Sequence, residues 1–185
     1  QNTHSTNTAQ DIAQHCDALL YWGCDLETTT WGWGGQMASR MAFWFEDCGI
    51  KNIAIAPDCN YANAVHSDMW IPVLPNTDAA LQLAIAYVWM TEGTFDKDYV
   101  ETHTEGFDWF EYYVLGNEDG VPKSPEWAEP ICGIPAYRIK ALARYWASHA
   151  VSIAHCNGGS FIRAAFAHEP ARLEVYLLAM QGVGK

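Results

Sequence analysis

The fold is decided by residues 18–58, which read ALLYWGCDLETTTWGWGGQMASRMAFWFEDCGIKNIAIAPD. Two apolar runs, Ala18 to Trp22 and Asn52 to Ala56, have the length and composition of strands buried on both faces of a parallel sheet. Between them, residues 34–48 carry large apolar side chains at helical spacing and stop at Gly49, which is typical of a helix end. Strand, helix and strand in this order predict a right-handed crossover unit.

The alternation of strands and helices continues along the chain. Pro72 predicts an edge position for a strand at residues 70–73, because proline cannot donate to a sheet ladder. The other expected elements are a helix near residues 11–16, a helix from Thr77-Asp78 to Gly93, helices at 97–104 and 107–115, a surface loop at 117–127, a helix from 134 through 146, a strand at 151–155, and a helix at 161–180 that Pro170 kinks or divides.

These elements predict an α/β fold with a doubly wound, mainly parallel sheet flanked by helices, as in Rossmann and flavodoxin-like proteins. Residues 94–133 are expected to form a helical excursion from that sheet. We expect residues 1–185 to form a single α/β domain, and both ends read as cut from a longer chain.

Composition and charge narrow the range of partners. The formal net charge is -12, from 22 acidic and 10 basic residues, so the chain repels phosphate backbones and anionic lipid headgroups at long range. We therefore expect no nucleic-acid partner. No apolar stretch reaches the roughly 18 residues of a membrane-spanning helix, and none is predicted.

The usual metal and nucleotide motifs are missing from the sequence. The six cysteines show no C-x-x-C spacing, and the seven histidines show no H-x-x-x-H pair, so neither a zinc site nor an iron–sulfur cluster is predicted. Most of the cysteines are expected to be buried, reduced thiols. The chain has no G-x-G-x-x-G after its first strand and no G-K-[ST], which disfavours a standard nicotinamide or Walker site.

Ligands of such sheets bind beyond the carboxyl ends of the strands, so the loops that follow the strands are the candidate site. These loops are residues 23–27, 57–60 and 75–78, and all three are expected on one rim. A carboxylate there, Asp58 or Asp78, could accept the N1-H and N2 amino hydrogens of guanine together. Asp is also typical of turns, and Asp78 stands where a helix N-cap is expected, so the residues alone leave both readings open.

The ordered combination of four segments is more specific than any one motif: YWGCDLET, NIAIAPDCNYANAVHSDMWIPVLPNTDAALQLAIAYVW, GTFDKDYVETHTEGFDWFEYYVLG and DGVPKSPEWAEPICGIPAYRIKALARYWA. Together they resemble the dimethyl sulfoxide reductase family of molybdenum enzymes, from about Asp17 to Gly184. The segments WGCDLET and VLGNEDGVPKSPEWA are most similar to the branch of pyrogallol-phloroglucinol transhydroxylase and related enzymes.

The resemblance implies a cofactor and a set of contacts. Catalytic subunits of the family use molybdenum or tungsten held by two pyranopterin guanine dinucleotides, and this region is similar to the domain that binds one dinucleotide arm. It implies that Asp78 meets the guanine edge, that Thr77 meets the adjoining backbone or cofactor, and that Asp25 replaces a commoner Asn. Cys59 stands where the family has Arg, which weakens a phosphate or ribose contact there. The implied cofactor-binding residues are Trp22, Gly23, Cys24, Asp25, Glu27, Asp58, Asn60, Pro75, Thr77 and Asp78.

The resemblance also implies what lies outside these 185 residues. The expected partners are the rest of a parent catalytic subunit and an iron–sulfur electron-transfer subunit, with an iron–sulfur cluster expected elsewhere in the full protein. The metal ligand and the acid/base groups are also expected elsewhere, so no catalytic or metal-binding residue is assigned here. The compartment, cytoplasmic or exported, depends on a twin-arginine signal that would precede Gln1. The alternatives are a free-standing nucleotide-binding or flavodoxin-like module and a noncatalytic interaction domain.

Overall fold

The structure, a computed structural model, describes residues 8–25, 27, 37–154 and 164–183. Its contacts divide the chain into two units, residues 1–72 with 149–158, and residues 73–148 with 159–185. The expectation of a single domain over residues 1–185 stays a prediction.

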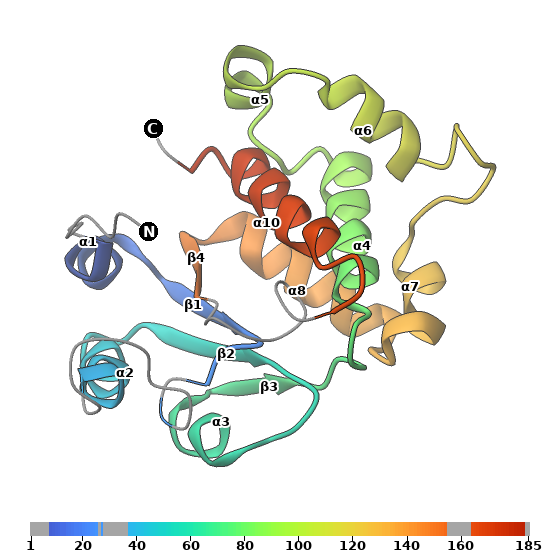
Figure 1. The fold of residues 1–185 in the computed structure, drawn as a ribbon. Helices are drawn as coiled ribbons and strands as arrows, with labels where there is room; N and C mark the ends of the chain where they lie inside the picture. Colours follow the sequence, from blue (N-terminus) through green and yellow to red (C-terminus); the bar gives the residue numbers. More distant parts are fainter. Residues whose placement is uncertain (1–7, 26, 28–36, 155–163, 184–185) are drawn as a thin grey trace. The chain divides into compact units, whose positions relative to one another are not determined.

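A parallel sheet organises the first unit (Figure 1). Its strands are β1 (Ala18–Trp22), β2 (Lys51–Ile55), β3 (Met69–Ile71) and β4 (Val151–Ala154), in the order β3-β2-β1-β4. All three strand pairs are parallel, so the predicted α/β fold is confirmed. Pro72 correctly predicted that β3 lies at the edge, but the strand ends at Ile71 because the proline cannot extend the ladder. The predicted last residue of β4, His155, lies outside the described residues.

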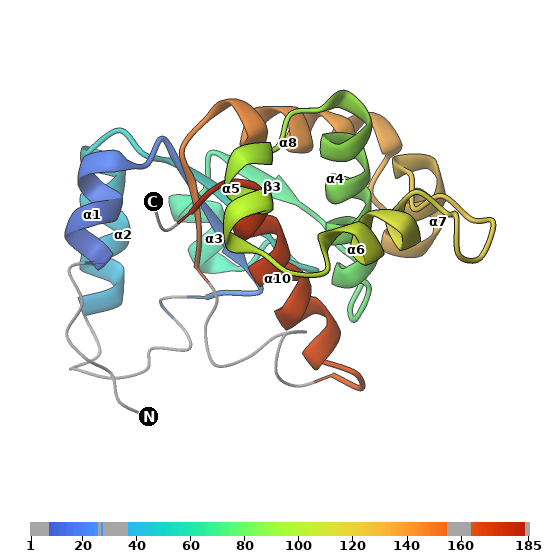
Figure 2. The same ribbon diagram turned by 90° about the horizontal axis from the view of Figure 1, so that it is seen from above.

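One face of the sheet packs against two helices, α1 (Thr8–His15) and α2 (Met37–Asp47), which lie beside each other in both views (Figures 1 and 2). Leu19 and Tyr21 of β1 form a buried cluster there with Phe45 of α2, and the apolar residues of α1 pack against it. All five residues of β1 are buried, so both faces of this strand are covered. This explains why its sequence is apolar throughout instead of alternating.

The helix α3 (Tyr61–His66) was not predicted. It is six residues long, too short to show a helical period, and follows directly on the loop of residues 57–60. The Asn60 side chain caps it by accepting a hydrogen bond from the Asn63 N–H. The helix α1 was predicted, but it begins at Thr8 instead of Asp11.

In the second unit the helix α4 (Asp78–Glu92) is central and contacts α7 (Pro125–Cys132), α8 (Ala136–Ser148) and α10 (His168–Met180). Ten of its residues are buried, because it is apolar on all sides. Trp89 donates a hydrogen bond from Nε1 to the Ala143 carbonyl at 2.7 Å, and Gln82 donates from Nε2 to the Pro170 carbonyl at 2.9 Å. These two buried N–H donors of α4 are thereby paired with carbonyls of the helices around it. Gly93 ends α4 in the left-handed conformation, as predicted.

The helical excursion at residues 94–133 is confirmed by α5 (Lys97–His103), α6 (Phe107–Val114) and α7. The predicted loop at residues 117–127 was too long, because α7 begins at Pro125. Ser124 caps this helix by accepting from the Trp127 N–H, and proline suits the first turn of a helix.

Pro170 was predicted to kink or divide a helix over residues 161–180, and it does not kink the described helix. Helix α10 begins at His168, so Pro170 lies in the first turn, where a missing N–H breaks no helical hydrogen bond. Residues 161–163 of the predicted helix lie outside the described residues, and residues 164–167 form a bend and a turn.

The prediction that most cysteines are buried was also wrong. Among the described residues, Cys24 and Cys132 are buried, whereas Cys48 and Cys59 are exposed because they lie at the end of a helix and in a strand-end loop. None of these four described cysteines is in a disulfide bond. Across the part of the chain that the structure describes, no helix has the length and apolar character needed to cross a membrane.

Gly116 and Gly120 offer a matched test of the packing in the second unit. Both adopt positive φ, 82° and 74°, but a Cβ on Gly116 would lie 2.4 Å from the Pro122 nitrogen, whereas one on Gly120 would meet nothing within 4 Å. We expect Gly120→Ala to destabilise by about 1–2 kcal/mol through its backbone conformation alone. Gly116→Ala should cost clearly more, because the backbone around Pro122 must also move. Thermal unfolding of the two variants measures the difference, and equal unfolding temperatures would contradict the packing described here.

Candidate functional site

The loop after β1 begins with a backbone conformation that favours glycine. Gly23 has φ 58°, and its N–H donates to the Ile55 carbonyl at 2.8 Å, which continues the β1–β2 ladder by one bond. Asp25 then closes a small turn, because its Oδ1 accepts a hydrogen bond from the Glu27 N–H at 2.9 Å. The loop thus leaves the strand with its first carboxylate fixed.

A hydrogen bond joins this loop to the loop after β2. Asn60 donates from Nδ2 to Oδ2 of Asp25 at 2.9 Å, while its Oδ1 caps α3. Asn63 in turn donates from Nδ2 to the Asp58 carbonyl at 3.2 Å, which fixes the start of the second loop. The structure therefore brings together four predicted site residues, Asp25, Glu27, Asp58 and Asn60, at the carboxyl ends of two neighbouring strands. Their binding role stays a prediction.

The Glu27 side chain contacts the helices that cover this end of the sheet. Its Oε1 lies 3.2 Å from Nε2 of His66, which is within ion-pair distance but lacks the alignment of a hydrogen bond. On the other side of the imidazole, Nδ1 of His66 lies 2.5 Å from Oε1 of Glu46. The other carboxylate oxygen of Glu27 is buried and has no hydrogen-bond partner among the described residues. His66 and Glu46 were not predicted as site residues, because their distance along the sequence from Glu27 gives no signal.

The remaining predicted residues of the first loop lie deeper. Trp22 is fully buried and Cys24 is buried, so neither side chain lies on the surface of the rim. Tyr21 is buried next to Cys24, and its hydroxyl has no partner within the described part of the chain. Burial raises the pKa of Tyr21, and Cys24 and Glu46 raise it further, so the phenol keeps its proton. The base of the first loop is therefore apolar, and its polar groups begin at Asp25.

The third predicted loop, with Pro75, Thr77 and Asp78, belongs to the second unit. Of the predicted capping pair Thr77-Asp78, Thr77 holds the N-cap position of α4 and Asp78 is the first helical residue. Thr77 does not cap with its side chain, because its Oγ1 donates to the Leu74 carbonyl at 2.7 Å. Asp78 is buried at 4% exposure, which is unusual for a carboxylate at a helix start. That these residues share a rim with the first two loops stays a prediction.

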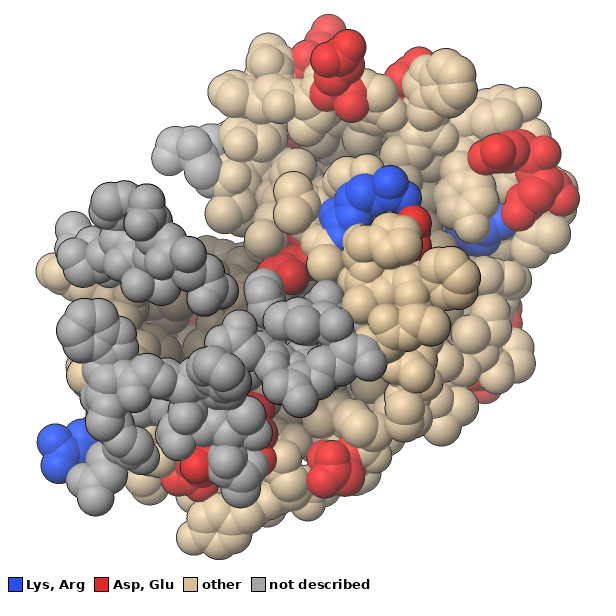
Figure 3. Space-filling view, viewed as in Figure 1, with Lys and Arg blue, Asp and Glu red and all other residues tan. Residues whose placement is uncertain are grey.

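The two joined loops offer hydrogen-bond acceptors and no cation, since residues 22–27 and 57–60 include no Lys or Arg. Such groups suit the hydroxyls of a ribose or the N–H groups of a base better than a phosphate. On the face drawn in Figure 3, the described Asp and Glu side chains are dispersed and more numerous than Lys and Arg. Among the described residues, no group of three or more His, Cys, Asp or Glu side chains could hold a metal ion.

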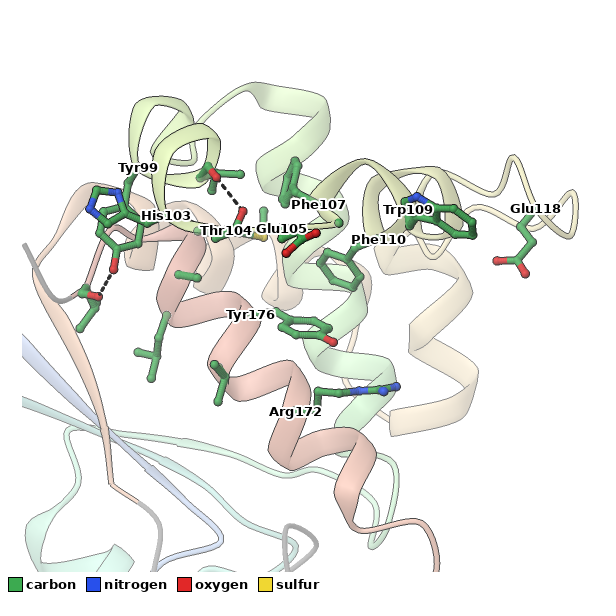
Figure 4. Close-up of a pocket in the computed structure, with 17 residues that line it drawn as sticks. Tyr99, His103, Thr104, Glu105, Phe107, Trp109, Phe110, Glu118, Arg172 and Tyr176 are labelled. Atoms are coloured by element: carbon green, nitrogen blue, oxygen red, sulfur yellow. Dashed lines mark hydrogen bonds between the residues drawn. The ribbon is translucent and has the colours of Figure 1, made fainter.

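A separate cavity of about 780 Å³ lies in the second unit and was not predicted. It is lined by α5, α6 and α10, and Figure 4 shows Phe107, Phe110 and Tyr176 close together along it. Tyr99 and His103 stack at 4.3 Å between ring centroids, and Arg172 is paired with Glu169. The cavity contains none of the predicted site residues.

The parallel sheet makes this an α/β protein, and in open sheets of this kind the loops at the carboxyl ends of the strands are where ligands bind.

No protein-family model matches the sequence. The chain is 36% identical over its whole length to the pyrogallol hydroxytransferase large subunit of Pelobacter acidigallici, and the match covers 21% of that protein. It is 36% identical to the trimethylamine-N-oxide reductase of Haemophilus influenzae over 75% of the chain and 17% of the reductase.

Among solved structures, acetylene hydratase from Pelobacter acetylenicus has the same fold with a TM-score of 0.72 and 23% identity, over 92% of this chain and 22% of the hydratase. The chain thus spans about a fifth of the length of the relatives it matches. It belongs to the dimethyl sulfoxide reductase family of molybdopterin enzymes, and it matches a small part of each relative.

Variants of Asn60 test the connection between the two loops. Asn60→Ala removes the cap of α3, worth about 1 kcal/mol, and the bond to the Asp25 carboxylate, worth about 1.5–3 kcal/mol. Asn60→Ser keeps a capping oxygen but is too short to replace the bond to Asp25. We expect the serine variant to unfold between the wild type and the alanine variant in thermal denaturation. A serine variant as stable as the wild type would show that the bridge adds no stability.

Proposed function

We propose that this chain binds the nucleoside end of one guanine dinucleotide arm of a bis-pyranopterin molybdenum or tungsten cofactor, as part of a larger oxidoreductase or transhydroxylase. The observation that carries the proposal is the bond between Asp25 and Asn60, which gathers acceptors at the carboxyl ends of β1 and β2. The molybdopterin enzymes among the relatives support the class of cofactor.

The strand order supports the same location. The chain runs outward from β1 to β2 and β3, and β4 then pairs with the opposite side of β1. The crevice at such a reversal of strand order is where doubly wound sheets bind their ligands. The loop that carries Asp25 follows β1 at this point.

The residues present fit a nucleoside better than a diphosphate. Asp25, Glu27 and Asn60 offer oxygen acceptors, and a nucleoside offers ribose hydroxyls and the guanine N–H groups as donors. The orphaned Glu27 oxygen would gain a partner from such a donor, which removes the cost of leaving it buried and unpaired. Asp78 in the second unit is the residue we propose for the guanine edge, with Pro75 and Thr77 beside it.

In this proposal the chain binds and orients the cofactor and contributes no reacting group. When bound, the cofactor supplies redox or hydroxyl-transfer chemistry through its metal. For the whole protein we propose hydroxyl transfer between phenolic compounds, because the pyrogallol hydroxytransferase matches all of this chain, whereas the N-oxide reductase matches 75% of it. That relative is named a large subunit, which supports a second subunit, and we propose an iron–sulfur electron-transfer protein for it.

The alternative functions are a free-standing flavodoxin-like module and a noncatalytic interaction domain. The full reading frame distinguishes them from the proposal. Pterin-binding sequence on both sides of residues 1–185 supports the proposal, and stop codons close to both ends would overturn it.

Asp25→Ala in the full-length enzyme tests the site in the first unit. The variant loses the acceptor of both the Glu27 N–H and the Asn60 amide, so we expect about tenfold less cofactor per polypeptide after gel filtration. Guanosine monophosphate released by acid hydrolysis and metal measured by mass spectrometry report the content. Asp108→Ala, which removes an exposed carboxylate in the first turn of α6, is the control and should retain the wild-type content. Full content in Asp25→Ala would contradict the proposed site.

Asp78→Asn tests the recognition of guanine. The amide keeps the size of the carboxylate but replaces one acceptor with a donor, so it cannot accept the N1-H and the N2 amino group together. We expect a loss of guanosine monophosphate and metal from the purified enzyme, with an unfolding temperature of the apoprotein close to that of the wild type. Asp108→Asn serves as the matched control. If the Asp78→Asn enzyme keeps the wild-type content of guanosine monophosphate, Asp78 does not recognise the guanine base.

A further inference from the structure

His66 joins three elements around the proposed site. Its side chain is 5% exposed and lies between the Glu27 carboxylate in the loop after β1 and the Glu46 carboxylate in α2, at 3.2 Å and 2.5 Å. The ring of Phe43 meets the imidazole edge to face, with centroids 4.6 Å apart. Both ring nitrogens therefore face a carboxylate, and the ring cannot turn without losing one of these contacts.

The two ring nitrogens make the arrangement specific to histidine. The imidazole places Nδ1 and Nε2 on different sides of one rigid ring, so a single side chain contacts both carboxylates. Asparagine and glutamine carry a single amide nitrogen, so they cannot direct one nitrogen at each of two carboxylates. Tyr21 and Cys24 line the same small cavity as His66, and burial raises the pKa of Tyr21, so its phenol stays neutral.

The position of Glu27 is transmitted to Asp25 by the turn that connects them. The Glu27 N–H donates to Oδ1 of Asp25, and Oδ2 of Asp25 accepts from Asn60 at the start of α3. His66 is the last residue of the same helix. The loop after β1 is thus attached to α3 at both ends of the helix, through Asp25 at its start and through Glu27 at its end.

We propose that His66 and Glu46 are positioning residues of the nucleotide site, which hold the Glu27 carboxylate and, through the turn, the Asp25 carboxylate. One oxygen of Glu27 is then committed to His66, and the other accepts a hydrogen bond from a hydroxyl or N–H donor of the bound nucleoside. This inference rests on the proposed function, because it assumes that Asp25 and Glu27 contact the cofactor. It adds residues that neither touch the cofactor nor belong to the predicted loops.

The test uses His66→Asn, Glu27→Gln and Glu46→Gln in the full-length holoenzyme. The rate at which cofactor leaves the protein is measured as guanosine monophosphate recovered after hydrolysis of successive filtrates, at one temperature well below unfolding. We expect His66→Asn and Glu27→Gln to release cofactor about tenfold faster than the wild type, and Glu46→Gln to have a smaller effect because it acts through His66. The double variant of His66 and Glu27 should be no faster than either single one, because the two residues act as a unit.

Glu126→Gln is the matched control, because Glu126 also forms an ion pair, at 2.5 Å with Lys140, and belongs to the second unit. It should release cofactor at the wild-type rate. Variants that lower the unfolding temperature but keep the wild-type release rate would show a structural role only and overturn the inference. Should His66→Asn fail to fold, the release rates of the isosteric variants Glu27→Gln and Glu46→Gln decide between a positioning role and a purely structural role.

The Asp25→Ala variant distinguishes a failure of the proposed function from a failure of the positioning role. If it retains its cofactor, the proposed function itself fails. If it loses cofactor while the His66, Glu27 and Glu46 variants behave as the wild type, the site stands and the positioning role of His66 and Glu46 is wrong.

Discussion

The hydrogen bond from Asn60 to Asp25 is the interaction on which the described site depends. It joins residues 35 positions apart, and it can form because β1 and β2 pair in parallel, with Trp22 opposite Ile55. Parallel pairing places the carboxyl ends of neighbouring strands side by side, so the loops that follow them start close together. Asn60 uses its other amide atom to cap α3, and a single side chain therefore fixes both the start of a helix and the carboxylate of the neighbouring loop.

The charges around this bond determine which part of a nucleotide would suit the proposed site. Asp25, Glu27 and Glu46 are acidic, His66 lies between two of them, and the two loops contain no cation. A phosphate would be repelled here, whereas hydroxyl and N–H donors would find acceptors. The family resemblance places an arginine where this chain has Cys59, and this exposed thiol cannot supply the charge. Under the proposed function, these two loops therefore favour the nucleoside, and phosphate contacts would come from other groups.

Much of the fold could be predicted because its signals are local. The runs ALLYW and NIAIA predicted two strands to within a residue, Pro72 predicted the edge, and Gly93 predicted the end of α4. The incorrect predictions also have causes in the local sequence. Helix α3 is too short to show a helical period. The turn residues before Pro125 led to the prediction of a loop where α7 begins. Pro170 was predicted to kink or divide a helix, but it lies in the first turn of α10. The starts of α3 and α7 carry side-chain caps, from Asn60 and Ser124, which periodicity does not reveal.

The sequence by itself determined the class of fold, the strand-end loops and the family, because buried strands, glycine stops and the order of motifs are properties of neighbouring residues. The tertiary structure decided which of those residues meet. It paired Asp25 with Asn60, put Trp22 out of reach of the surface and made Thr77 instead of Asp78 the N-cap of α4. It also placed His66 between Glu27 and Glu46, two residues far from it along the chain. Contacts of this kind follow from the packing of helices on a sheet, and no spacing in a single sequence encodes them.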